Sequence, residues 1–89
     1  MKKNIQYCVV GLSHKSADLT VRGDFSLNKD QIEKLLAKAK EDGLQELIVI
    51  STCNRTELMG IVHDPKILID YLCSFSGGEV SVFLKKGYV

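Results

Sequence analysis

An amphipathic segment between two short apolar runs constrains the fold of this chain more than any other feature. Residues 28–40 predict a helix, because Asn28 can cap the first turn and Gln31 stands three positions later, as in a capping box. Apolar side chains recur there at helical spacing, at Ile32, Leu35, Leu36 and Ala39. The flanking runs 5–12 and 46–51 are short and apolar, which predicts a strand in each. We expect the second strand to be covered on both faces.

The rest of the chain predicts three further main elements. A strand over residues 56–62 follows a tight connection, a helix begins after the Asp-Pro pair at 64–65, and a last strand covers residues 80–84 after two glycines. A single helical turn at 18–22 stands in the loop-like stretch after the first strand, and we expect the next two residues to interrupt it.

The order strand, helix, strand, strand, helix, strand predicts an α+β domain. It is typical of the ferredoxin-like βαββαβ layout, with a small, mostly antiparallel sheet and the helices on one face. Eighty-nine residues are enough for one domain, which we place at 1–89. A fold of this kind does not by itself indicate a function.

Composition excludes several classes of protein. The 45% hydrophobic content fits a globular domain, and a net charge of +1 gives no electrostatic sign of nucleic-acid binding. No apolar run approaches the roughly 18 residues of a membrane span and the start lacks a signal peptide, so we expect a cytoplasmic protein. Three widely spaced cysteines without a CxxC pair indicate neither a disulfide framework nor a metal site. No two glycines form a GxG, so the sequence lacks the usual motif for binding a dinucleotide.

Cys53 is the strongest candidate for chemistry, because it follows a buried run directly and has small polar neighbours. A cation two positions later, Arg55, can favour the thiolate or can bind a substrate carboxylate with two hydrogen bonds. The backbone amides of Asn54 and Arg55 are candidates to face an oxyanion. The alternative for Cys53 is an inert buried thiol, which is what we expect for Cys8 and Cys73. The alternative for Arg55 is a surface arginine paired with an acid.

His14 is a second candidate, in the polar loop that follows the first strand. If that strand neighbours the Cys53 strand and runs parallel to it, both loops open at the same edge, and the histidine can serve as the base of a Cys–His pair. The alternative, which we favour from the residues alone, is a histidine that hydrogen-bonds within its own loop. Ser13 and His14 are therefore candidates for supporting roles.

Two motifs together resemble one family. Gly11-Leu12-Ser13-His14-Lys15-Ser16-Ala17 and Ser51-Thr52-Cys53-Asn54-Arg55-Thr56-Glu57 are similar to the N-terminal catalytic domain of glutamyl-tRNA reductases, over nearly the whole chain. Two differences stand out: Asp18 replaces the usual proline, and Gly23-Asp24 replaces a stretch that is usually helical. We expect the first short helix to be shorter or looser than in the family.

The resemblance implies a specific activity. Glutamyl-tRNA reductases use NADPH to reduce glutamyl-tRNA to glutamate-1-semialdehyde, the first step of the C5 route to 5-aminolevulinate and tetrapyrroles. The cysteine matching Cys53 forms a thioester, and the positions matching Thr52, Asn54 and Arg55 line the glutamate pocket. The family continues into a histidine-bearing segment, an NADPH domain and a dimerisation domain, so we expect a fragment of a homodimeric enzyme that is inactive alone.

Two other functions fit parts of the sequence. Ferredoxin-like sheets also serve as non-catalytic interaction or RNA-binding modules, but these usually carry aromatic residues on the sheet, and no RNP-like grouping is present. A redox-signalling role for Cys53 lacks an evident resolving cysteine.

Overall fold

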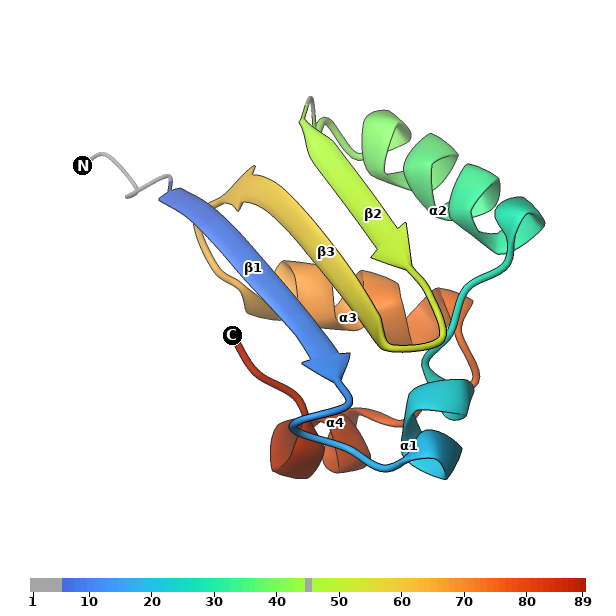
Figure 1. Ribbon diagram of the computed structural model, residues 1–89. Helices are drawn as coiled ribbons and strands as arrows, with labels where there is room; N and C mark the ends of the chain where they lie inside the picture. Colours follow the sequence, from blue (N-terminus) through green and yellow to red (C-terminus); the bar gives the residue numbers. More distant parts are fainter. Residues whose placement is uncertain (1–5, 45) are drawn as a thin grey trace.

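The computed structural model describes residues 6–44 and 46–89. Three strands form an antiparallel sheet in the order β1-β3-β2, with β1 at Gln6–Ser13, β2 at Leu47–Ser51 and β3 at Arg55–Val62. Since β1 and β2 each run antiparallel to β3, they are parallel to one another with β3 between them (Figure 1). The end of β1 and the β2–β3 turn therefore lie at the same end of the sheet.

Four helices complete the fold of the described residues. The longer two, α2 (Lys29–Glu41) and α3 (Lys66–Phe75), pack on one face of the sheet, and the short α1 (Leu19–Asp24) and α4 (Val80–Lys86) lie at the end where β1 stops (Figure 1). The α+β class is confirmed, with helices on one face of a small antiparallel sheet.

The core lies between the sheet and these helices. Strand residues alternate, so that one set faces the helices and the other set faces away. Val10 and Leu58, which are cross-strand partners, are fully buried, as are Leu68 and Leu72 of α3. The rings of Phe25 and Phe83 meet edge to face with their centroids 6.0 Å apart.

Local signals for α2 are confirmed. The Asn28 side chain accepts from the backbone of Gln31 and the Gln31 side chain accepts from the backbone of Asn28, both at 2.8 Å, which completes the capping box. Gly43, just past the end of the helix, has a φ of 95°, a conformation that favours glycine.

The predicted last strand at 80–84 is wrong, because this segment is helix α4. The two preceding glycines favoured a turn into a strand, yet Leu84 is 69% exposed, and it is Phe83 that enters the core. Packing of one aromatic ring has outweighed local β-propensity. In the described residues the β1 edge pairs beyond the sheet at one point only, an isolated antiparallel bridge between Gly11 and Tyr88.

Two smaller expectations also fail. Strand β2 is covered on one face only, since the described residues place no element over the outer face and Ile48 is 54% exposed. Helix α1 is not interrupted by Gly23 and Asp24, which form its last two residues. Asp18 caps this helix by accepting from the backbone of Val21 at 2.9 Å.

Candidate functional site

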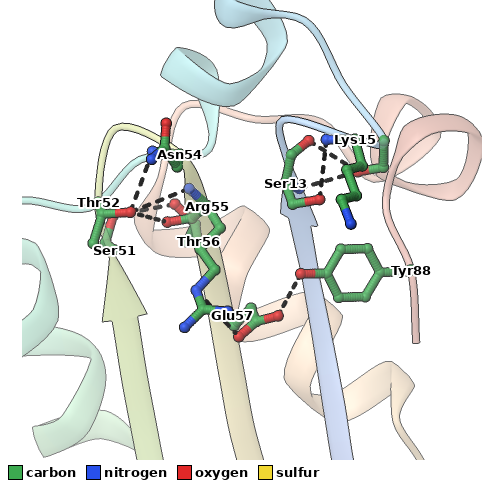
Figure 2. A network of polar contacts seen from close by, with 10 residues as sticks. Ser13, Lys15, Ser51, Thr52, Asn54, Arg55, Thr56, Glu57 and Tyr88 are labelled. Carbon is green, nitrogen blue, oxygen red and sulfur yellow. Dashed lines mark hydrogen bonds and ion pairs between the residues drawn. The ribbon is translucent and has the colours of Figure 1, made fainter.

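The turn between β2 and β3 is held by one threonine (Figure 2). The backbone N–H of Thr52 donates to the carbonyl of Arg55 at 2.8 Å. Its hydroxyl oxygen accepts from the backbone N–H groups of Asn54 and Arg55, each at 3.2 Å. The expectation that these two amides face an oxyanion is therefore wrong for this conformation, because both already donate to Thr52.

Cys53 lies at the tip of this turn and is exposed, whereas Cys8 is buried and Cys73 is partly buried. The thiol of Cys53 lies 3.9 Å from the side-chain oxygen of Asn54, at the limit of a weak hydrogen bond. Burial raises the pKa of the Cys73 thiol, and the neighbouring charge of Asp70 acts in the same direction. Of the three thiols, only Cys53 is freely presented to solvent.

Arg22 supports the Cys53 loop from helix α1, a contact that the sequence did not reveal. Its Nε donates to the backbone carbonyl of Cys53 at 3.3 Å, and its Nη1 donates to the carbonyl of Ala17 at 2.8 Å. The guanidinium thus joins the loop after β1 to the β2–β3 turn. A single arginine in a short exposed helix gives no periodic signal that predicts such a contact.

The backbone of His14 pairs with the turn. Its N–H donates to the carbonyl of Asn54 at 2.9 Å, which extends the β1–β3 ladder one residue beyond Ser13 and Arg55. Strand β1 does not neighbour β2, so one premise of a Cys–His pair is wrong, although both loops do open at the same end. Within residues 6–44 and 46–89 the imidazole of His14 forms no hydrogen bond with the Cys53 thiol.

Ser13 organises the loop on the other side. Its N–H donates to the hydroxyl of Ser16 at 3.0 Å, and its own hydroxyl accepts from the backbone of Lys15 at 3.2 Å (Figure 2). These short-range bonds fold the loop tightly, so the position of His14 is set by local structure.

Arg55 faces outward from β3 and is paired. Its Nε lies 3.8 Å from Oε1 of Glu57, two residues along the same face of the strand. The Arg55 side chain is 52% exposed while that of Glu57 is only 14% exposed. The pairing that we considered as an alternative therefore exists, but it leaves half of the arginine accessible to a ligand.

Tyr88 completes this cluster and was not singled out from the sequence. Its hydroxyl donates to Oε2 of Glu57 (Figure 2). Burial and the Glu57 carboxylate raise the pKa of Tyr88 to about 12, against the opposing charge of Arg55. Only the strand register could have shown this contact, since Tyr88 reaches Glu57 across β1.

These residues surround an open cavity of about 540 Å³. Its lining consists of Ser13, His14, Lys15, Thr52, Asn54, Arg55 and Tyr88. Two of these residues are cationic and none is acidic, so the cavity favours an anionic group. Cys53 does not line it but lies between Thr52 and Asn54, which do. The structure thus brings the predicted site residues to one end of the sheet, with Cys53 next in the chain to two of the residues that line the cavity.

The described part of the chain contains no group of three or more His, Cys, Asp or Glu side chains placed to hold a metal ion. Nor does a helix within residues 6–44 or 46–89 have the length and apolar character needed to cross a membrane.

Comparison with known proteins gives one consistent result. The family model described as "Glutamyl-tRNAGlu reductase, N-terminal domain" matches residues 10–89. Glutamyl-tRNA reductase 2 of Flavobacterium johnsoniae is 42% identical over 89 residues, which cover 100% of this chain and 20% of that protein. Glutamyl-tRNA reductase of Christiangramia forsetii is 45% identical over 83 residues, covering 93% of this chain and 20% of the relative. The chain therefore spans about a fifth of the length of these curated relatives.

Proposed function

Since the chain belongs to the family of glutamyl-tRNA reductase N-terminal domains, we propose that it recognises glutamate and forms the thioester in an enzyme that reduces glutamyl-tRNA. The product is glutamate-1-semialdehyde, at the first step of the C5 route to 5-aminolevulinate and tetrapyrroles. The observation that carries this proposal is the exposed thiol of Cys53, which stands in the chain between two residues that line a cationic cavity.

The cavity suits the side chain of a glutamyl group. Arg55 is half exposed and lies within it, so its guanidinium is available to bind a carboxylate with two hydrogen bonds. Thr52 and Asn54 line the same wall, and Lys15 adds a second cation. Ser13 and His14 have supporting roles as the opposite wall of the cavity.

Cys53 then reacts with the ester. The thiolate attacks the ester carbonyl, a carbon–sulfur bond forms, and the bond from that carbon to the tRNA oxygen breaks. The tRNA leaves as the free hydroxyl after taking a proton, and the glutamyl group stays on sulfur. A thioester accepts hydride more readily than an ester does, because sulfur donates less electron density into the carbonyl.

The hydride donor lies outside this chain. No pair of glycines forms a GxG, and the cavity has no glycine among its lining residues, so these residues do not fit a dinucleotide. We assign NADPH, which supplies the hydride, to a domain of a longer, homodimeric and cytoplasmic enzyme. The 89 residues alone are then inactive as a reductase.

A non-catalytic interaction or RNA-binding module is the alternative function, and the site supports it less. RNA-binding sheets of this size present several stacking rings. Among the described aromatic residues only Tyr7 is exposed, and the hydroxyl of Tyr88 is engaged by Glu57.

A domain exchange tests the proposal. The matching residues of glutamyl-tRNA reductase 2 of Flavobacterium johnsoniae are replaced by this chain, and the formation of glutamate-1-semialdehyde from glutamyl-tRNA is followed. We expect the hybrid to be active, the hybrid carrying Cys53→Ser to be inactive, and the hybrid carrying Cys73→Ser to keep its activity. A hybrid that is folded yet equally active with Cys53→Ser contradicts the proposal.

A further inference from the structure

We propose that Arg22 is a positioning residue for Cys53, and that its hydrogen bond to the backbone carbonyl of Cys53 holds the thiol where it can attack the glutamyl ester. This inference rests on the proposed function, because it takes Cys53 as the nucleophile. It adds to the site a residue of helix α1 that lies 31 positions before the cysteine in the chain.

The peptide group that joins Cys53 to Asn54 is held at both of its polar atoms. Its carbonyl oxygen accepts from Nε of Arg22 at 3.3 Å, and its N–H donates to the hydroxyl of Thr52 at 3.2 Å. Because a peptide group is planar, contacts at these two atoms fix its rotation as well as its place. The Cα atom of Cys53 belongs to this plane, so the contacts also fix the point from which the side chain departs.

Arg22 is the side-chain part of the attachment that holds the tip of the turn. The next carbonyl, that of Asn54, accepts from the backbone N–H of His14 at 2.9 Å. The two carbonyls at the tip therefore bind two different segments, one through a backbone donor and one through a side chain. Among the described residues, Arg22 is the only one outside the turn whose side chain hydrogen-bonds to Cys53.

The guanidinium of Arg22 is itself held in place. Its Nη1 donates to the carbonyl of Ala17 at 2.8 Å, so two of its nitrogens have fixed partners. Phe25, which ends the helix of Arg22, is fully buried. Just beyond it, the N–H of Leu27 donates at 2.9 Å to the hydroxyl of Ser51, the last residue of β2. The segment that carries the arginine is thus anchored both in the core and to the strand that leads into the turn.

A support of this kind acts on the direction of attack by the thiol. Cys53 is exposed, so a small reagent can approach the sulfur from many directions and does not depend on its exact place. A glutamyl ester bound in the cavity offers only one direction, and a displacement of about 1 Å can cost about 100-fold in rate. Loss of Arg22 therefore slows glutamyl transfer much more than it slows alkylation.

The test compares these two reactions in the native chain and in Arg22→Met, which removes the donors of the guanidinium. The chain is mixed with glutamyl-tRNA at a series of concentrations and quenched in acid, and the glutamyl group on Cys53 is quantified by mass spectrometry. We expect the maximum rate of transfer to fall about 10- to 100-fold, while the half-saturating concentration of glutamyl-tRNA changes by less than about threefold. Alkylation of Cys53 by iodoacetamide should keep its native rate.

Matched variants separate this role from a general loss of stability. Lys34→Met removes an exposed cation that pairs with Asp30 on α2, and it should leave both rates unchanged. In Arg22→Ala, millimolar guanidinium ion should restore part of the maximum rate of transfer by binding in place of the missing side chain. A mere loss of stability would not be restored, because guanidinium favours unfolding.

A second substitution covers the case in which circular dichroism shows that Arg22→Met is unfolded. Arg22→Lys then takes its place, since it keeps the positive charge but a single ammonium lacks the planar fork that binds both carbonyls. It should lower the maximum rate of transfer about tenfold, again without a change in the rate of alkylation.

Three contrary results are distinguishable. If the native chain takes up the glutamyl group on Cys53 and the folded Arg22 variant does so at the same maximum rate, the positioning role is overturned and the proposed function stands. If alkylation slows as much as transfer does, Arg22 acts on the reactivity of the thiol instead of its place, and the positioning role is again overturned. If the native chain takes up no glutamyl group on Cys53, both proposals are overturned.

Discussion

The same strands form both faces of the sheet, but the inner face packs into the core while the outer face is exposed. On the inner face Val10, Leu12 and Leu58 are at most 1% exposed and pack against the helices. On the outer face Tyr7 and Ile48 are more than half exposed. Because side chains alternate along a strand, one strand supplies core and site residues at neighbouring positions. Stability and binding can therefore be altered separately by substituting adjacent residues.

Adjacent positions in β3 give the largest expected contrast in stability. Leu58 is fully buried, and Leu58→Ala should lower the free energy of unfolding by about 2–5 kcal/mol. Met59 is partly exposed on the outer face, and Met59→Ala should cost less than about 1 kcal/mol. Urea unfolding measures both. Equal losses would contradict the division between the faces.

Two glycines test the close contact on the outer face. Gly11→Ala places a methyl group 2.5 Å from the Thr56 backbone oxygen, so the strands must shift, at a cost of about 1–3 kcal/mol in the free energy of unfolding. Gly23 in helix α1 has no atom within 4 Å of an added Cβ. Gly23→Ala should therefore be neutral or stabilising by up to about 1 kcal/mol. Thermal unfolding of both variants decides the matter, and a harmless Gly11→Ala would show that β3 does not approach this glycine so closely.

The capping box tests the helical layer that covers the inner face. Asn28→Ala removes the side-chain acceptor at the start of α2 and should cost about 1 kcal/mol in the free energy of unfolding. Asn28→Asp keeps an acceptor and should change stability little. Denaturant unfolding of the pair checks this, and an equal loss in both variants would exclude capping as the cause.

The smallest effect concerns pH and the contact between α2 and α3. The Tyr71 hydroxyl donates to Asp42 at 2.6 Å, which lowers the pKa of Asp42, while burial and that carboxylate raise the pKa of Tyr71 to about 12. The contribution of this hydrogen bond to the free energy of unfolding is complete above the ordinary aspartate pKa of 3.8 and below the ordinary tyrosine pKa of 10.0. It is lost as pH falls through the lowered pKa of Asp42 or rises towards 12.

Comparison of the native chain with Tyr71→Phe reveals this dependence. The difference in their free energies of unfolding should be constant from about pH 5 to 9. It should shrink in acid, as Asp42 takes up a proton, and again in strong base. A difference that stays the same down to pH 2 would show that the hydrogen bond does not stabilise the fold.

The sequence predicted most of the fold because its local signals agree with the packing. The capping box at Asn28 is such a case, as is the helix predicted after the Asp-Pro pair at 64–65, which is α3. The prediction for residues 80–84 failed because the two preceding glycines indicated a turn into a strand, whereas the segment forms helix α4, which buries Phe83 in the core. Coverage of β2 failed because an apolar run does not show which side of a strand is covered.

The candidate site was predicted residue by residue but not as an arrangement. Motif positions gave Cys53 and Arg55, and the structure places them at one end of the sheet with His14. The use of the turn amides by Thr52 depends on turn geometry, and the contact of Glu57 with Tyr88 depends on strand register. Neither can be read from residue types alone.

Covalent capture of the glutamyl group tests the central claim most directly. The chain is incubated with glutamyl-tRNA, quenched in acid and analysed by intact-mass spectrometry and peptide mapping. We predict a mass increase of one glutamyl group on Cys53, reversed by hydroxylamine, absent in Cys53→Ser and retained in Cys8→Ser and Cys73→Ser. If Cys53→Ser acquires the same adduct, or if the adduct maps to Cys8 or Cys73, Cys53 is not the nucleophile and the account is contradicted.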